Sequence, residues 1–226
     1  SEHEWPLKRT KYQKWNLHSN GNANSVMGNG TLSKEKQTEV KPDIFKYDPR
    51  FPVQTVGGGT CCSPHIVPWG PYDQRVVESR NDVLCYTSDI LQDDLEVTGP
   101  IKLILYASTN VTNTDWTAKL VDVFENGYAM NLCDGILRAS HRNSMSDPEE
   151  VIPGEIYLYE IDIGVTSNVF KKGHKIRLEV SSSNFPKFDR NPNTGKQFGT
   201  ETDLKTATQV IHHNDEYPSH LILPII

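Results

Sequence analysis

Hydrophobic and polar residues alternate along most of the chain after about residue 82. In "KIRLEV", Ile176, Leu178 and Val180 fall on one face and charged residues on the other, as in a strand with one buried face. "IKLILYAS" (101–108) alternates in the same way, and turn signals such as Asn126-Gly127 separate roughly eight segments of this kind. Without helices between them, these segments predict an all-β fold, a jelly-roll β-sandwich.

Two parts of the chain depart from this pattern. Residues 1–70 read as irregular, because "HSNGNANSVMGNGTLS" and the Pro- and Gly-rich stretch around "VGGGTCCSP" favour turns. "ETDLKTATQVIHH" (201–213) reads as a short helix. We therefore predict an irregular N-terminal arm over residues 1–70 and a folded β domain over residues 71–226.

Composition narrows the range of partners. The chain has 226 residues, 36% of them hydrophobic, and a net charge of −6, which gives no reason to expect a nucleic-acid or membrane partner. Its four cysteines include no C-x-x-C pair, which favours reduced thiols and a cytoplasmic location. The sequons at Asn29 and Asn110 leave secretion open.

Sequence motifs for catalysis are absent. No G-x-S-x-G nucleophile elbow, HExxH, Walker A or G-x-G-x-x-G motif occurs, so no catalytic residue is predicted in this chain. Of the eight histidines, only His212 and His213 are adjacent, and neighbouring side chains diverge on a strand or a helix. We therefore expect neither a metal site nor a cofactor.

Aromatic residues within the predicted strands suggest an alternative function. Aromatic rings can stack on sugars, and the rings in question belong to Trp116, Tyr128, Tyr157 and Tyr159. Alternation places Trp116 on the same face as Ala118 and Leu120, which indicates the core rather than a binding platform. A free-standing carbohydrate-binding β-sandwich module is the alternative function.

Several longer stretches resemble a known family. "GPYDQRVVESRNDVLCYTSDILQDDLEVTGPIKLILYAST", "TDWTAKLVDVFENGYAMNLCDGILRAS", "GHKIRLEVSSSNFPKFDRNPNTG" and "YPSHLILPII" resemble the C-terminal domain of the X-Pro dipeptidyl-peptidase / cocaine esterase family of serine hydrolases. The resemblance covers most of residues 70–226. A looser one, in "EWPLKRTKYQKWNLHSNG" and "YDPRFPVQTVGGG", is to the connector from the family's α/β-hydrolase domain.

This resemblance implies both a fold and a partner. The fold is a jelly roll of the galactose-binding-like type, and the partner is an N-terminal α/β-hydrolase domain of the same polypeptide that holds the Ser-Asp-His triad. The chain is then a non-catalytic accessory domain that braces the catalytic domain and helps to shape the substrate cleft. The other partner to consider is a second copy of this chain. The two copies would form a homodimer through the surface that would otherwise face the hydrolase domain.

The resemblance also assigns roles to two segments. It implies that Thr60, Cys61 and Cys62 approach the substrate cleft, where their small side chains would leave the acyl pocket roomy. The alternative is that Cys61 and Cys62 simply fill the interface between the two domains. The resemblance further implies interdomain contacts through Trp69, Tyr72, Arg75 and Arg80, which follow in the sequence. The two arginines are expected to pair with carboxylates of the hydrolase domain.

The loop "SSSNFPKFDRNPNTG" (181–195) matches a family signature, and its residue types favour a structural role. Short amide and carboxylate side chains can bond to the backbone of their own turns, and phenylalanines can anchor a loop by burial. The residues with this predicted role are Asn184, Phe185, Asp189, Asn191 and Asn193.

Overall fold

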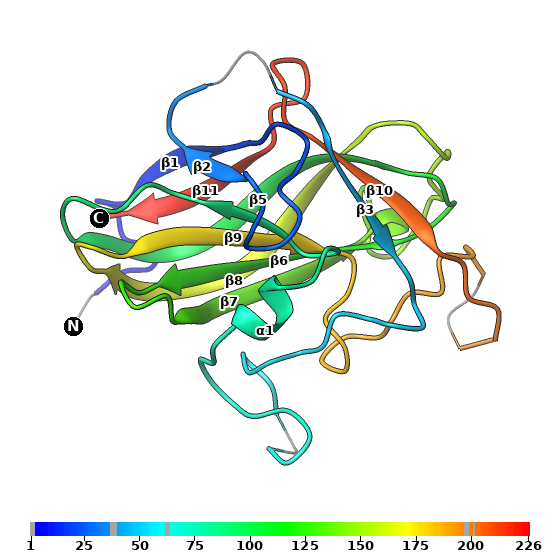
Figure 1. Ribbon diagram of the computed structural model, residues 1–226, viewed down its shortest axis with the longest axis horizontal. Coiled ribbons are helices and arrows are strands. Elements are labelled where there is room, and N and C mark those ends of the chain that lie inside the picture. The colour runs from blue at the N-terminus through cyan, green and yellow to red at the C-terminus, as the bar shows by residue number, and fades with distance from the viewer. Residues whose placement is uncertain (1–2, 37–39, 62–63, 197–198, 201) are drawn as a thin grey trace.

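The computed structural model describes residues 3–36, 40–61, 64–196, 199–200 and 202–226 (Figure 1). Its strands are β1 (Lys11–His18), β2 (Thr31–Ser33), β3 (Asp43–Tyr47), β4 (Leu84–Thr87), β5 (Leu95–Thr109), β6 (Asp115–Val123), β7 (Ala129–Arg138), β8 (Tyr157–Phe170), β9 (Lys175–Ser181), β10 (Ala207–His212) and β11 (His220–Ile225). The helical elements of the described residues are short, α1 (Arg75–Glu78) and the 3-10 turn η1 (Ala139–His141). The prediction of an all-β fold is confirmed.

One continuous sheet folds back on itself to form the sandwich. Its strand order is β3-β10-β5-β11-β1-β2-β4-β9-β6-β7, and β8 pairs with β5 beside this path. Nearly all ladders are antiparallel, the short β2–β4 contact being parallel. The half that contains β5, β8 and β11 packs on the half that contains β6 and β9. The jelly-roll and galactose-binding-like assignments stay predictions.

The core lies between these two halves. Ile101, Leu103 and Leu105 of β5 point inward from one half, and all three are fully buried, as the alternation predicted. Trp116 of β6 points inward from the other half, and its ring lies 5.6 Å from that of Tyr159 on β8. Large apolar side chains from distant parts of the chain therefore meet in one cluster and hold the two halves together.

Strands β7 and β8 approach each other so closely that only glycine fits at one position. A Cβ atom on Gly135 of β7 would lie 1.9 Å from the backbone oxygen of Asp162 on β8. We expect Gly135→Ala to lower the free energy of unfolding by about 2–3 kcal/mol, because backbone must move to admit the methyl group. The shift of the urea midpoint measures this loss.

Gly127→Ala is the matched control for Gly135→Ala. Gly127 has a positive φ of 82°, but a methyl group added there would meet no atom within 4 Å, so only backbone strain opposes the change. We expect a loss of about 1 kcal/mol there. Equal losses of unfolding free energy in the two variants would show that the close approach of β7 to β8 does not determine the cost of Gly135→Ala.

Two sequence predictions about secondary structure are wrong. Residues 1–70 are not irregular throughout, since β1 pairs with β11, β2 with β4, and β3 with β10. The predicted helix at 201–213 contains strand β10, which lies between β3 and β5. In both cases backbone hydrogen bonds to distant strands outweigh local preferences.

A long segment covers the outer face of the half that contains β6 and β9. This segment, the strap (residues 48–61 and 64–83), leads from the end of β3 to β4 and includes α1; its distal loop hangs below the sheet in Figure 1. Apolar contacts join it to β4 through Val53, Val77, Val83 and Cys85. The core buries the inward face of β6 and the strap its outward face, so every residue of β6 is buried, including Lys119.

Candidate functional site

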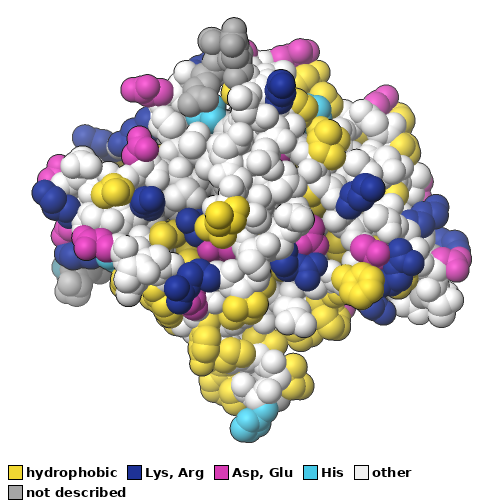
Figure 2. All heavy atoms as spheres, in the orientation of Figure 1, with side chains coloured by type: hydrophobic (Ala, Val, Ile, Leu, Met, Phe, Trp, Pro, Cys, Tyr) yellow, Lys and Arg dark blue, Asp and Glu magenta, His cyan; other side chains and the backbone are white. Residues whose placement is uncertain are grey.

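Large apolar side chains are exposed along the strap. Ile66 is 72% exposed and Trp69 is 54% exposed, both on the loop that hangs below α1. Figure 2 shows hydrophobic side chains gathered over this loop at the lower edge of the molecule. We use the name apolar surface for the exposed large apolar side chains of the strap together with Phe185; those of the strap are Phe51, Ile66, Trp69, Tyr72 and Val76. Exposed aromatic clusters of this kind mark contact sites for other proteins or domains.

The backbone fixes the loop that carries much of this surface. Gly58 and Gly70 exchange two backbone hydrogen bonds, of 2.7 and 3.0 Å, and so close the neck of the loop. Both have positive φ angles, which glycine adopts without steric cost. Past the neck, Asn131 of β7 accepts a 2.6 Å bond from the amide of Tyr72 and ties the loop to the sheet.

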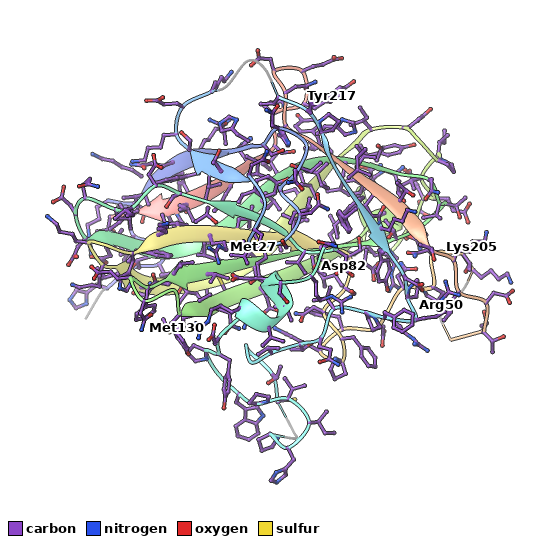
Figure 3. All side chains as sticks on the ribbon, viewed as in Figure 1. Met27, Arg50, Asp82, Met130, Lys205 and Tyr217 are labelled. Carbon is purple, nitrogen blue, oxygen red and sulfur yellow. The ribbon has the colours of Figure 1, made fainter. Side chains whose placement is uncertain are left out.

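The arginines of the strap have local carboxylate partners. Arg75 bonds to Asp73, and its guanidinium lowers the pKa of that carboxyl. Arg80 bonds through two nitrogens to Asp82, each at 2.7 Å, and Arg50 pairs with Asp48 in the same way (Arg50 and Asp82 are labelled in Figure 3). The apolar surface is therefore flanked by charge pairs that are neutral overall. Pairing of Arg75 and Arg80 across a junction stays a prediction.

A groove of about 450 Å³ opens beside the apolar surface, between the strap loop and the loop after β9. It is lined by Gly59, Thr60, Cys61, Ile66, Val67, Pro186, Lys187 and Phe188. Its walls are mainly apolar, with the Thr60 hydroxyl and the Lys187 ammonium as polar groups. A groove of this size and composition can hold part of a small ligand or a side chain of a neighbouring domain.

The Lys187 side chain is held at the groove by a carboxylate on β7. Its Nζ atom lies 2.6 Å from Oδ1 of Asp134, whose other oxygen accepts a 2.8 Å bond from the Asn184 amide. The Lys187 amide also donates to the Thr55 hydroxyl on the strap. The groove is thus attached to the sheet and to the strap, and its positive charge is neutralised locally.

The cysteines differ from the expectation of four reduced thiols. Cys61 is disulfide-bonded, so that expectation is wrong at this position. Cys62, the other cysteine predicted beside the cleft, lies outside the described residues. Cys85 and Cys133 are free thiols, and burial raises the pKa of Cys133 to about 12, so it stays protonated and unreactive at neutral pH.

The loop at 181–195 is buried at its base and exposed at its tip. The Asn191 amide donates to Asp115 at 2.8 Å, and the Asn193 amide donates to the Lys205 carbonyl at 2.7 Å. Phe185 and Asp189 lie at the exposed tip, so Phe185 does not anchor the loop by burial. The base therefore connects strands, while the tip contributes to the groove and the apolar surface.

A buried Ser-His-Asp cluster is present, but its geometry is not that of a catalytic triad. Nε2 of His213 faces both Asp43, at 2.9 Å, and Ser19, at 3.3 Å, and Ser19 donates directly to Asp43. A triad needs the carboxylate on Nδ1 and the serine alone on Nε2. All three residues are buried, so we assign the cluster a structural role.

The structure gives no support to the carbohydrate-binding alternative. Trp116 and Tyr159 are fully buried, while Tyr128 and Tyr157 are partly buried, so these rings do not form an exposed platform. Within the described ranges, no group of three or more His, Cys, Asp or Glu residues is placed to hold a metal ion. Nor does any helix in that part of the chain have the length and apolar character to span a membrane.

Part of this site was predicted from the sequence and part was not. Trp69 and Tyr72, which were expected to make interdomain contacts, lie on the apolar surface. Phe51, Ile66 and Val76 were not singled out, because they stand in a segment without strand periodicity. That absence of periodicity was the available signal, because large apolar residues in such a segment have no strand face on which to be buried.

These features define a β-sandwich domain with exposed apolar side chains on its strap. The chain belongs to the family of the X-Pro dipeptidyl-peptidase C-terminal non-catalytic domain, whose family model matches residues 1–222. The carbohydrate-binding alternative is not supported by this membership either.

Similar proteins are larger than this chain. The cocaine esterase of Rhodococcus sp. (strain MB1 Bresler) is 46% identical over 227 residues, which cover the whole chain and 39% of the esterase. A crystal structure of an aminopeptidase from a marine sediment Thaumarchaeota archaeon superposes with a TM-score of 0.85 at 28% identity, over 99% of this chain and 38% of the other. An α-amino acid ester hydrolase gives a TM-score of 0.82 at 27% identity, over 95% of this chain and 36% of that enzyme. The chain therefore spans about two fifths of such proteins.

Proposed function

We propose that this chain is the C-terminal accessory domain of an α/β-hydrolase-type serine hydrolase that acts on ester or amide acyl groups. The observation that carries this proposal is the family match over residues 1–222, together with 46% identity to a cocaine esterase of which the chain covers 39%. The remaining length of such a relative is ample for a catalytic domain. In that domain a serine would attack the acyl carbonyl while histidine moves the proton.

In this proposal the apolar surface braces the catalytic domain. Tyrosine and tryptophan dominate the binding energy of many interfaces, and Trp69 and Tyr72 supply exposed rings of both kinds. The flanking pairs, Asp48–Arg50 and Asp73–Arg75, carry no net charge, so the contact would depend mainly on apolar burial. Residues before about 70 would provide the connection from the hydrolase domain, in addition to strands β1 to β3.

The groove supports a second part of the proposal, in which this domain forms one wall of the substrate cleft. Thr60 and Cys61 line it, and the resemblance to the family assigns the same segment to the cleft. Their small side chains would leave room for a bulky acyl group. The cytoplasmic location and the homodimer stay predictions.

Turnover of p-nitrophenyl acetate, with and without a serine-directed fluorophosphonate label, tests the non-catalytic role. We expect the purified chain to show no turnover above buffer and no covalent adduct. The longer polypeptide should hydrolyse the ester and accept one label. Stoichiometric labelling of a serine within residues 1–226 would contradict the proposal.

Association with the separately produced hydrolase part tests the bracing role. We expect Trp69→Ser to weaken binding at least tenfold, since a buried aromatic anchor is worth about 2 kcal/mol or more. Leu158→Ser on β8 is the control, because Leu158 is 49% exposed but lies outside the strap. Sedimentation of the chain alone as a dimer that Trp69→Ser disrupts would instead assign the surface to self-association.

A further inference from the structure

Four charged side chains are buried where the strap crosses the sheet. Glu78 of α1 accepts a 2.6 Å bond from Arg177 of β9, and Lys119 of β6 lies 3.5 Å from Glu179 of β9. Each of the four residues is less than 9% exposed. Gln74, one turn before Glu78, accepts a 3.0 Å bond from Lys119. The strap therefore rests on the sheet partly through buried charges.

The carboxylates of this cluster are incompletely satisfied. Oε1 of Glu78 and Oε1 of Glu179 are both buried and have no hydrogen-bond partner. A buried acceptor without a partner costs about 1–3 kcal/mol, and more when it is charged. A proton on one of these carboxyl groups would remove a buried charge.

The groups around the cluster make no hydrogen bond to these two oxygens. On β4, the Thr87 hydroxyl accepts a bond from Arg177, and the Cys85 thiol carries no charge because burial raises its pKa. On β7, Asp134 stands opposite Lys119 in the ladder, but it is bonded to Lys187 and Asn184. On the strap, Asp73 and Asp82 pair with the neighbouring arginines, Arg75 and Arg80.

The geometry favours Glu179 as the group that takes up the proton, because its cation lies 3.5 Å away whereas Glu78 has one at 2.6 Å. Burial raises the pKa of Glu179 to about 7; Lys119 opposes the rise and the negative charge of Glu78 adds to it. In an open strap, water would reach Glu179 and return its pKa toward the ordinary value near 4.5. The closed strap therefore binds more protons than the open strap between these two values.

We propose that Glu78, Arg177, Lys119 and Glu179 form a proton-operated latch between the strap and the sheet. With a proton on Glu179, the junction buries one charge fewer, and the strap stays closed. Loss of the proton leaves an ionised Glu179 in the buried junction with its cation, Lys119, at 3.5 Å, and opening of the strap lets water solvate that charge. The latch concerns this chain alone and holds whether or not the proposed hydrolase partner is correct.

The sign of the pH dependence follows from linkage. A group whose pKa is higher in the closed state stabilises closure at low pH, and that stabilisation is lost as pH rises through the closed-state value. We expect the loss between about pH 4.5 and 7, at up to tenfold in the opening equilibrium for each pH unit. Above about pH 7.5 the opening equilibrium should be constant, because Glu179 is then ionised in both states.

Amide hydrogen exchange of the purified chain from pH 5 to pH 8 tests the latch. The amides of Val77 and Glu78, which donate to the Gln74 carbonyl, report strap opening, and the amide of Leu103 in β5 reports global unfolding. After correction for the intrinsic rate, protection at Val77 should fall by a factor of ten or more between pH 5 and pH 7. Protection that does not change over this range would overturn the proposal.

Glu179→Gln is the decisive variant, because its side chain is uncharged at every pH. We expect its strap protection to be independent of pH and to exceed that of the wild type at pH 7.5. Glu160→Gln on β8 is the control, since that carboxylate is exposed and pairs with Lys102 away from the strap; its profile should match the wild type. If strap protection in Glu179→Gln changes with pH as steeply as in the wild type, the latch is overturned.

A measurement on the wild type covers the case in which Glu179→Gln does not fold. Carbon-13 labelling of glutamate carboxyls allows each group to be titrated by NMR. The latch requires one buried glutamate carboxyl with a midpoint near pH 7. If every glutamate of the folded chain titrates at or below its ordinary value, the latch does not exist.

Discussion

Replacing Trp116 with alanine is expected to lower the free energy of unfolding by about 3–5 kcal/mol, a large part of the total stability of a domain. Trp116 is completely buried between the two halves of the sandwich, and its ring lies 5.6 Å from that of Tyr159. The substitution removes an aromatic contact between β6 and β8 and leaves a cavity that rigid strands on both sides cannot close. Urea unfolding followed by circular dichroism measures the loss.

Trp69→Ala is the matched control, because it makes the same chemical change at a side chain that is 54% exposed. We expect it to change the unfolding free energy of the isolated chain by less than about 0.5 kcal/mol. It should nevertheless weaken any contact made by the apolar surface. Comparable losses from the two substitutions would mean that Trp69 is buried in solution and that the strap packs differently.

Asp43→Asn is expected to cost about 3–5 kcal/mol at pH 7, because it removes the charge around which a buried network is organised. The Asp43 carboxylate accepts bonds from Ser19, His213, Tyr86 and the Ala23 amide. Burial alone would raise its pKa, but the bond from His213 and the others outweigh that effect and lower it. The stabilisation from this ionised group is therefore present above about pH 4 and is lost as pH falls through the lower native value.

Urea midpoints at pH 7 and pH 3 measure both parts of the Asp43 prediction. The difference in urea midpoint between the wild type and Asp43→Asn should be largest at neutral pH and should become smaller in acid. Asp203→Asn is the control, since the side chain of Asp203 is 75% exposed and its substitution should be neutral. A gap that is constant from pH 7 to pH 3 would contradict the assignment of a lowered pKa.

The fold class could be predicted from the sequence because its core strands have one strongly apolar face. Alternation at Ile101, Leu103 and Leu105 identified β5, and the same pattern at 176–180 identified β9. Strands β2 and β10 could not be found in this way. β2 has only three residues, and β10 owes its conformation to hydrogen bonds with β3 and β5, which are remote in sequence.

The polar face of β9 shows the limit of pattern analysis most clearly. Arg177 and Glu179 alternate with apolar residues and therefore indicate a face exposed to solvent, yet both are buried under the strap. Nothing local to β9 indicates that a segment about 100 residues earlier covers it. The cluster with Glu78 and Lys119 is for the same reason visible only in three dimensions.

The candidate site was predicted in part, and by resemblance rather than by pattern. Thr60 and Cys61 line the groove as expected of a cleft segment. The contribution of Lys187 and its attachment to Asp134 could not be foreseen, because β7 and the loop after β9 meet only once the sheet has formed.

Pairing of the first and last strands has a consequence for biosynthesis. Lys11 of β1 lies opposite Ile225 of β11, so β11 inserts between β1 and β5 as the final piece of the sheet. During translation, β1 therefore emerges more than 200 residues before its neighbour and waits with an unpaired edge, the state in which strands most readily join the wrong partner. If translation stops before β11, the released chain lacks the strand that joins β1 to β5. The unpaired edges of β1 and β5 would then be exposed to quality-control proteases. Synthesis of β11 is thus the step that closes the sheet between β1 and β5.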